Sequence, residues 1–307
     1  MSVVTSAAVS MTNEDYHRDY SRDSNSSKEL YRESRETYEA IRVLGTMDPP
    51  PPTDDMILGT HCHTALLEPE VFANRATPMP NIEVPELAPD GKKWLRRKGS
   101  DHEKWWADFE RHRDGVLRDW TEENVGKYEI SDKHLATAQA VREAALANEV
   151  IRSLIEETPP HRREHTVVWD CCETGLPLKS RRDIYHERLI CDIKTIGVTL
   201  SAASVARRIA SLGYHRQADF YTMGEQAFSG EKRVFVFLFL STKPPYSVGL
   251  FDIDGDDLAF ARKQNLETLA AMERCRRDPS QYKPEYAKGI FTVTLPGWAK
   301  HEDDWGF

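Results

Sequence analysis

The chain has 307 residues, of which 39% are hydrophobic and 30% are charged, and this composition excludes wholesale disorder. No window approaches the ~18 consecutive apolar residues of a membrane helix, and the N-terminus lacks the basic and apolar regions of a secretory signal. Five cysteines, an odd number in so long a chain, indicate a reducing compartment rather than a disulfide scaffold, so we expect a cytoplasmic protein with no membrane association.

The N-terminal half is predicted to be mainly helical. Residues 1–25 are rich in Ser, Asp and Asn, and we expect a flexible segment there, followed by a single domain over residues 26–307. Apolar side chains then recur at helical spacing, and proline runs end two of these stretches. The predicted helices cover residues 27–44, 53–66, an aromatic stretch containing Trp105, Trp106 and Trp120, and 131–157. Residues 75–100 are Pro-rich and then basic, and are predicted to form a loop.

From about residue 165 the pattern changes to that of strands. The predicted strands cover residues 165–169, 178–185, 188–196, 234–241 and 247–253. The helices predicted between and after them cover residues 201–210, 214–227 and 256–277. This order predicts a mixed α/β domain, in which a central mixed sheet is flanked by helices and carries a helical N-terminal layer.

Positive charge is concentrated in two places, although the net charge of the chain is -9. Residues 161–220 hold 10 Lys and Arg against 7 Asp and Glu, and a second cluster consists of Lys92, Lys93, Arg96, Arg97 and Lys98. The negative sum argues against a simple nucleic-acid coat. Each cluster alone is typical of a solvated face, and the second is also our candidate for a loop that grips DNA.

The residues with the clearest chemical meaning lie on two consecutive predicted strands. The first strand carries Asp183, and the second carries Asp192 and Lys194. Because side chains at i and i+2 of a strand share a face, Asp192 and Lys194 point the same way, and pairing of the strands would bring Asp183 to them. Two carboxylates suit Mg²⁺, which lowers the pKa of a bound water and stabilises charge on a phosphoryl group. A bare D-x-K tripeptide, however, is more often a surface ion pair.

Five further residues are candidates for the same site. Glu164 precedes a strand that enters the same sheet, and is an additional candidate carboxylate. Tyr214, Gln217 and Tyr221 share one helix face. A buried aromatic stripe is the simpler interpretation of the tyrosines, but the glutamine between them favours contacts with phosphate and sugar. His63 lies on an otherwise apolar helix, where a core histidine is the more common case.

Several motifs in order resemble the exonuclease VIII (RecE-type) nuclease domain, a PD-(D/E)xK family close to the RecB-type nucleases. Gly59-Thr60, His63 and Leu66-Leu67-Glu68-Pro69 resemble its G-T-x-x-H-x-x-L-L-E-P signature. The other similar elements are Tyr16-His17, Ser24 to Leu30, Glu164, Thr174-Gly175, Lys179, Arg181, Asp183, Asp192-Ile193-Lys194-Thr195, Tyr214-His215, Gln217-Ala218, Phe220-Tyr221 and Leu295-Pro296 with Trp298. The resemblance spans roughly residues 13–300.

This resemblance implies a PD-(D/E)xK nuclease core and an Mg²⁺-dependent exodeoxyribonuclease, with Mn²⁺ able to replace Mg²⁺. Such enzymes degrade linear double-stranded DNA from its 5′ ends, form ring-like homo-oligomers and act with a single-strand annealing recombinase, often in a phage recombination module. Carried over to this chain, His63, Asp183 and Asp192 would hold the metal. Asp183, Asp192, Lys194, Gln217 and Tyr221 would form the catalytic set, and Lys179, Arg181 and Tyr214 would bind the substrate.

Two features test the resemblance. Arg182 stands where the family has a proline before its first aspartate, but that proline shapes the strand and ligates nothing. Some RecB-type nucleases hold an iron–sulfur cluster with four cysteines. This chain has no C-x₂-C spacing, and only Cys275 follows the Q-x-x-x-Y segment, so we interpret the cysteines as core residues.

Two alternatives to the exonuclease hypothesis remain open at this point. One is another PD-(D/E)xK nuclease, either single-strand-specific or endonucleolytic. The other is a non-catalytic protein that binds DNA ends. The sequence also leaves open the cleavage polarity, the oligomer size, and whether the cluster at residues 92–98 and Trp105 and Trp106 contact DNA or pack internally.

Overall fold

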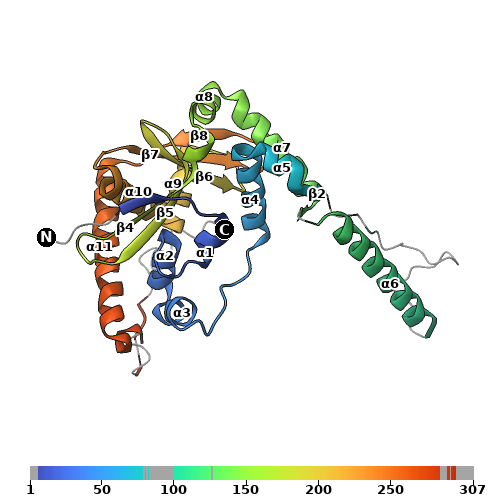
Figure 1. Cartoon of the computed structure of the whole chain (residues 1–307), viewed down its shortest axis with the longest axis horizontal. Coiled ribbons are helices and arrows are strands. Elements are labelled where there is room, and N and C mark those ends of the chain that lie inside the picture. Colours follow the sequence, from blue (N-terminus) through green and yellow to red (C-terminus); the bar gives the residue numbers. More distant parts are fainter. Residues whose placement is uncertain are drawn as a thin grey trace.

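A six-stranded mixed sheet forms the centre of the molecule, with helices on both faces (Figure 1). The computed structural model describes residues 6–78, 80, 82, 100–125, 127–283, 289–290 and 292–294. The strands, in spatial order, are β1 (Ser6–Val9), β4 (Arg163–Asp170), β5 (Pro177–Tyr185), β6 (Leu189–Ile196), β7 (Val234–Ser241) and β8 (Val248–Phe251). In this sheet β6 and β7 are parallel and the other neighbours are antiparallel. The predicted fold class is confirmed.

The helices surround this sheet in chain order. The N-terminal layer consists of α1 (Asn13–Arg18), α2 (Asn25–Glu33), α3 (Arg35–Tyr38) and a π-helical segment (Glu39–Val43). Next come α4 (Asp54–Leu67), α5 (Pro69–Arg75), α6 (Ser100–Glu123), α7 (Asp132–Ala147), α8 (Glu149–Glu157) and a 3₁₀ turn (Pro160–Arg162). The later helices are α9 (Ala202–Leu212), α10 (Tyr214–Ser229), α11 (Gly255–Arg277) and a 3₁₀ turn (Pro279–Tyr282). A small parallel pair, β2 (Ala76–Pro78) and β3 (Tyr128–Ile130), flanks α6.

Two hydrophobic cores lie on opposite faces of the sheet, and β7 contributes to both. Phe237 and Phe239 belong to the core beneath α10 and α11. Leu238 and Leu240 belong to the core beneath α4 and α7. This alternation follows from the two-residue period of a strand, and it explains why nearly the whole of β7 is apolar.

Four of the five cysteines lie in these cores, as the sequence predicts. Cys171 and Cys275 are buried in the first core, and Cys62 and Cys191 in the second. Cys172 is exposed, so the interpretation as a core residue is wrong for that position.

The N-terminal segment differs from the expected flexible stretch over residues 1–25. β1 forms an antiparallel edge strand on β4, from Ser6 opposite Trp169 to Val9 opposite Thr166. The Ser6 hydroxyl donates a hydrogen bond to the Ala227 carbonyl at 3.0 Å. Residues 6–25 therefore belong to the same folded unit as the sheet. Local sequence patterns miss this because the partner strand lies far along the chain.

Two predicted helices are interrupted by residues that cap a new helix. The helix expected over 131–157 breaks at Asn148, whose side chain accepts hydrogen bonds from two amides of α8 at 3.1 and 3.2 Å. The helix expected over 27–44 breaks at Ser34, whose hydroxyl accepts one from the Thr37 amide at 3.1 Å. Short polar side chains compete in this way with continuation of a helix.

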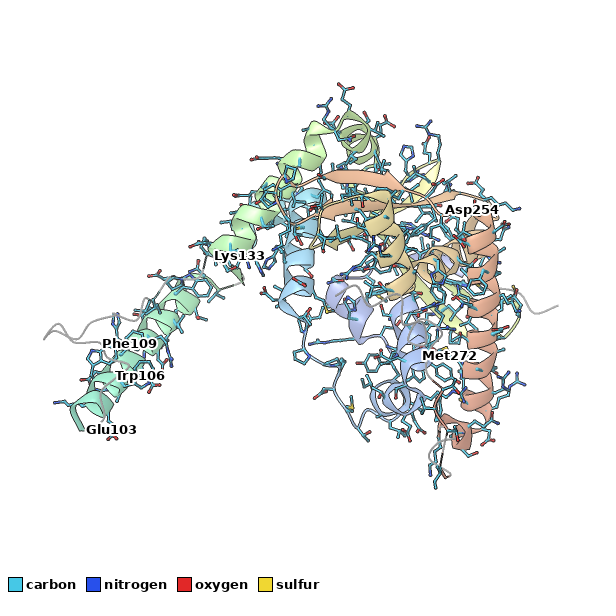
Figure 2. All side chains as sticks on the ribbon, turned by 180° about the vertical axis from the view of Figure 1, so that it is seen from behind. Glu103, Trp106, Phe109, Lys133, Asp254 and Met272 are labelled. Atoms are coloured by element: carbon cyan, nitrogen blue, oxygen red, sulfur yellow. The ribbon has the colours of Figure 1, made fainter. Side chains whose placement is uncertain are left out.

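α6 projects from the body of the molecule as an arm (Figures 1 and 2). The rings of Trp105, Trp106 and Phe109 lie 5.6 to 5.7 Å apart, centroid to centroid, so these aromatic side chains pack against one another.

The basic cluster at residues 92–98 and the closing motif at 295–298 fall outside the described residues. None of the helices in the described part of the chain is long and apolar enough to cross a membrane.

Candidate active site

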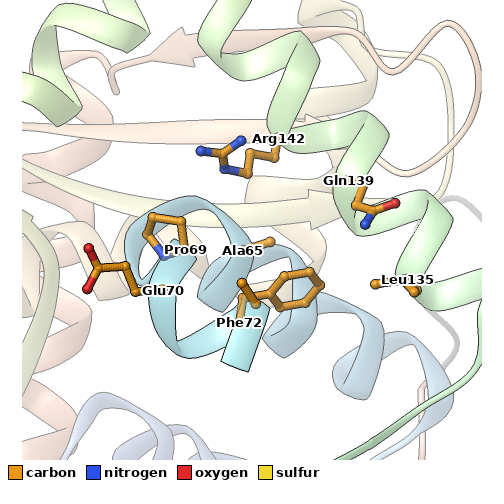
Figure 3. A pocket seen from close by; sticks show the side chains of 8 residues that line it. Ala65, Pro69, Glu70, Phe72, Leu135, Gln139 and Arg142 are labelled. Atoms are coloured by element: carbon orange, nitrogen blue, oxygen red, sulfur yellow. The ribbon is translucent and has the colours of Figure 1, made fainter. Parts of the chain in front are cut away.

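A cleft of about 1060 Å³ opens between the N-terminal layer, α4 and the start of α10. Its lining includes most of the predicted site residues: His63, Glu164, Arg181, Asp183, Asp192, Lys194, Tyr214, Gln217 and Tyr221. A second hollow of about 620 Å³ lies between α5 and α7, where Phe72 faces Leu135 and Gln139 (Figure 3). No described residue lines both, so the predicted chemistry is gathered in the first cleft.

The cleft begins where β5 and β6 separate. Their ladder contains only the pairs Ile184–Cys191 and Tyr185–Ile190. One step further, the Ile193 amide donates a hydrogen bond to Asp183 Oδ2 at 2.6 Å instead of to a backbone carbonyl. The carboxylate thus occupies the gap between the strands, and its position is fixed by the backbone that carries the D-x-K motif.

Asp183 is also held from the opposite side by α4. His63 Nε2 lies 3.1 Å from Asp183 Oδ2. Burial by itself raises the pKa of Asp183, but the attraction of His63 and Lys194, together with the hydrogen bonds, outweighs burial and keeps the pKa below its ordinary value. This carboxyl group is therefore ionised at neutral pH and available as a hard oxygen ligand.

Glu164 completes a group of three potential metal ligands. His63 Nδ1 lies 3.1 Å from Glu164 Oε1, and ligand atoms of His63, Glu164 and Asp183 all lie within 4.8 Å of one another. Glu164 has a left-handed backbone with φ 52°, which is uncommon outside glycine and typical of a functional constraint. Burial raises the pKa of Glu164 to about 7, against the attraction of His63.

The neighbouring carboxylates favour the protonated form of His63. Burial favours the neutral imidazole, but the attraction of Asp183 and Glu164 outweighs burial and raises the pKa of His63 to about 9. A divalent ion bound between these side chains would compete with that proton. Two hard oxygens and an imidazole nitrogen form a donor set that fits Mg²⁺ and suits Mn²⁺ better.

Asp192 is predicted to be a metal ligand, and in the structure its two carboxylate oxygens contact Gln217 and Lys194. Its Oδ1 accepts a hydrogen bond from Gln217 Nε2 at 2.8 Å, and its Oδ2 forms an ion pair with Lys194 Nζ at 2.6 Å. Burial raises the pKa of Asp192 to about 6, against the attraction of Lys194 and with the repulsion of Asp183. The predicted ligand set named Asp192 and held Glu164 in reserve, whereas the structure groups Glu164 with His63 and Asp183.

Lys194 is held on two sides. Besides its ion pair with Asp192, its ammonium lies 4.8 Å from the centroid of the Tyr214 ring. Burial lowers the pKa of Lys194, but the attraction of Asp192 and Tyr214 outweighs burial, so the pKa lies above its ordinary value. Tyr221, one turn beyond Gln217 on α10, is buried and lines the same cleft.

A glycine brings α4 close enough for His63 to reach the sheet. Gly59 lies one turn before His63, and a Cβ atom at Gly59 would lie 3.1 Å from Thr195 Oγ1. That distance is tighter than ordinary contact, so a side chain at position 59 would require the Thr195 side chain or α4 to shift by a few tenths of an ångström. The G-T-x-x-H spacing thus has a packing reason, which the sequence alone does not reveal.

Lys179 and Arg181, predicted to bind substrate, are occupied by the N-terminal segment. Lys179 is 1% exposed and donates hydrogen bonds to the carbonyls of Tyr16 and Asp19. It does not line the cleft, so the structure gives it a structural role in place of the predicted one. Arg181 does line the cleft, but its guanidinium donates to Thr166 Oγ1 at 3.0 Å and to acceptors in the N-terminal segment.

A buried ion pair connects β5 to α10 behind the cleft. Arg182 is fully buried, and its Nη2 lies 3.0 Å from Glu225 Oε2. Glu225 lies one turn after Tyr221 on α10. The pair therefore joins β5, the strand of Asp183, to α10, the helix of Gln217. Arg182 occupies the position at which the resembling family has a proline.

Two features of the cleft were missed by sequence reasoning. One is Arg208 on α9, and the other is a wall formed by Met11, Thr12, Asn13, Tyr16, His17, Ser24, Asn25 and Ser26. Tyr16-His17 and Ser24 belong to elements of the resemblance, but no pattern placed them in the cleft, and Arg208 lies in an ordinary amphipathic helix.

Comparisons with known proteins agree with this geometry. Among solved structures, the fold is similar to the crystal structure of a protein described as a putative exonuclease from Eubacterium rectale, with a TM-score of 0.55, 12% sequence identity, and coverage of 94% of this chain and 96% of that chain. No curated protein matches the sequence. Residues 30–290 match the model of the PDDEXK-like domain of unknown function (DUF3799). The chain therefore belongs to this PDDEXK-like family and has its α/β nuclease fold.

Proposed function

We propose that the protein is an Mg²⁺-dependent exodeoxyribonuclease that degrades linear double-stranded DNA, in the 5′-to-3′ direction, during DNA recombination. The observation that carries this proposal is the convergence of His63, Asp183, Asp192 and Lys194 in one cleft of a PDDEXK-like fold. A protein that only binds DNA has no need of a lysine held against a carboxylate beside three potential metal ligands.

The chemistry follows from the positions of these side chains. A divalent ion held by His63, Asp183 and a second carboxylate, Glu164 or Asp192, would activate water and neutralise charge on the phosphodiester. Lys194 places an ammonium group beside the Asp192 carboxylate, where it orients the attacking water or stabilises charge that develops on phosphate oxygens. Gln217 fixes the direction of the Asp192 carboxylate through its hydrogen bond.

The choice of DNA ends as substrate rests on the resemblance to RecE-type nucleases and on the exonuclease description of the similar crystal structure. The same resemblance supports a homo-oligomer and an annealing recombinase as a partner. A single-strand-specific or endonucleolytic nuclease of the same superfamily is the first alternative. A non-catalytic protein that binds DNA ends is the second.

Digestion of matched DNA substrates separates these functions. Linear duplex, the same duplex closed by hairpins at both ends, closed circular duplex and single strands are incubated with Mg²⁺, Mn²⁺ or EDTA. The proposal predicts rapid loss of open linear duplex with either ion and no loss with EDTA. Equal degradation of hairpin-closed duplex would favour an endonuclease, and end binding without cleavage in any divalent ion would favour the non-catalytic alternative.

A further inference from the structure

Three lysine or arginine side chains line the cleft in the described part of the chain, and two of them are occupied by protein partners. Lys194 pairs with Asp192. The Arg181 guanidinium donates to a hydroxyl, an amide oxygen and two carbonyls. The third, Arg208, forms no ion pair and no side-chain hydrogen bond with any described residue, and its Nε is buried without an acceptor.

Arg208 is directed to the cleft by the geometry of α9. Arg208 and Leu212 are four residues apart, share a helix face and both line the cleft. The preceding residue, Arg207, is exposed, does not line the cleft, and donates its Nε to the Ala203 carbonyl at 3.3 Å. α9 is the next helix after β6, which carries the D-x-K motif, and Arg208 and Lys194 line the same cleft.

A buried donor without an acceptor is energetically unfavourable. The cleft as a whole is also rich in carboxylates: Asp55, Glu68, Glu164, Asp183 and Asp192. A polyanion that enters such a cleft needs a cation that is not already neutralised by the protein. Arg208 supplies that cation, and its planar guanidinium matches the oxygens of a phosphate group.

We propose that Arg208 binds a backbone phosphate of the nucleic-acid strand that occupies the cleft. This inference rests on the proposed nuclease function and specifies how its substrate is held. The contact is independent of base sequence, because a guanidinium that binds phosphate reads no base edge. Arg208 is thus a substrate-binding residue rather than part of the hydrolytic set.

The test compares Arg208→Ala with Arg207→Ala, a matched removal of the neighbouring exposed arginine. Binding of a fluorescent duplex and of a single strand is measured by anisotropy in EDTA over a range of salt concentrations. We expect Arg208→Ala to weaken binding about tenfold and to reduce the slope of log Kd against log salt by about one. Arg207→Ala should leave both quantities near the wild-type values.

Kinetics in Mg²⁺ provides the second readout. Arg208→Ala should raise KM for DNA with little change in kcat, and Arg208→Lys should recover part of the loss because it keeps the charge. The melting temperature of Arg208→Ala should not fall, since the removed group has no protein partner. An unchanged Kd and salt slope for Arg208→Ala, or an equal change for Arg207→Ala, would overturn the inference.

Failure of the inference is distinguishable from failure of the proposed function. If the wild-type protein hydrolyses no DNA with any divalent ion, the nuclease proposal fails, whereas binding in EDTA still reports directly on Arg208. If the wild-type protein cleaves DNA and Arg208→Ala binds and cleaves it equally well, only the assignment of Arg208 fails.

Discussion

His63 Nε2 on α4 and the Ile193 amide on β6 both contact Asp183 Oδ2, at 3.1 and 2.6 Å. The same carboxylate oxygen therefore contacts a side chain of α4 and accepts a hydrogen bond from the backbone of β6. The relationship fixes α4 against the sheet and places the imidazole between Asp183 and Glu164. Most of the properties of the site follow from this junction.

Replacement of Asp183 or of Asp192 should abolish DNA hydrolysis without unfolding the protein. Asp183→Asn and Asp192→Asn keep the size of the side chain but remove a charge that supports the metal or Lys194. We expect at least about a 100-fold loss of cleavage rate, which corresponds to roughly 3 kcal/mol. Asp55→Asn is the control, because Asp55 lines the cleft but is exposed at its rim. Rates near wild type in both test variants would refute the site.

His63→Ala should distinguish a metal ligand from a core histidine. If His63 holds the metal, the variant should lose cleavage sharply, and Mn²⁺ should restore it better than Mg²⁺ when the concentration is raised. The measurement is the rate at several concentrations of each ion, with the melting temperature recorded in parallel. A lower melting temperature with an unchanged rate per folded molecule would assign His63 to packing alone.

Gly59→Ala should impair the site through packing. The added methyl group would lie 3.1 Å from Thr195 Oγ1, and we expect the crowding to shift α4, and His63 with it, relative to β6. We expect lower activity and a weaker metal response, with partial recovery in Gly59→Ala combined with Thr195→Ala. Gly115→Ala on α6 is the control, since a Cβ there meets nothing within 4 Å, and this half-buried helix position should gain about 0.5–1 kcal/mol. Equal activity of Gly59→Ala and wild type would show that α4 does not need the close approach.

Much of the sheet and many residues of the cleft could be predicted from the sequence, because local patterns and short motifs indicate them. The apolar run of β7 and the alternation around Asp192 and Lys194 indicate strands directly. The grouping of Glu164 with His63 depends on a left-handed backbone that no pattern signals. The pairing of β1 with β4 depends on a contact between distant segments. The hydrogen bonds from Lys179, predicted to bind substrate, to the carbonyls of Tyr16 and Asp19 are likewise contacts that no local pattern signals.

A buried lysine away from the cleft should give the stability a measurable pH dependence. Lys28 is 0% exposed, pairs with Glu29 at 3.0 Å and donates to Asn265 Oδ1. Burial lowers the pKa of Lys28 to about 8 from the ordinary 10.5, despite the attraction of Glu29. Between these two values the unfolded chain binds the proton and the folded chain does not, so the contribution of Lys28 to the free energy of unfolding should rise with pH.

Lys28→Met removes the titrating group and provides the comparison. The free energy of unfolding of the wild type minus that of the variant should increase between about pH 8 and 10.5, by at most ~1.4 kcal/mol per pH unit. Denaturant unfolding at a series of pH values measures this difference. A difference that is constant or falls across that window would show that Lys28 keeps its proton in the folded state.

We infer that the cleft around His63 and Asp183 hydrolyses DNA from its ends with a divalent ion. The most direct measurement is the release of nucleotides from an end-labelled linear duplex, with wild type, Asp183→Asn and Lys194→Ala compared in Mg²⁺ and in EDTA. We expect progressive release by the wild type in Mg²⁺ only, and none by either variant. Release that survives EDTA or the loss of Asp183, or a wild-type protein that binds the ends without releasing any nucleotide, would contradict it.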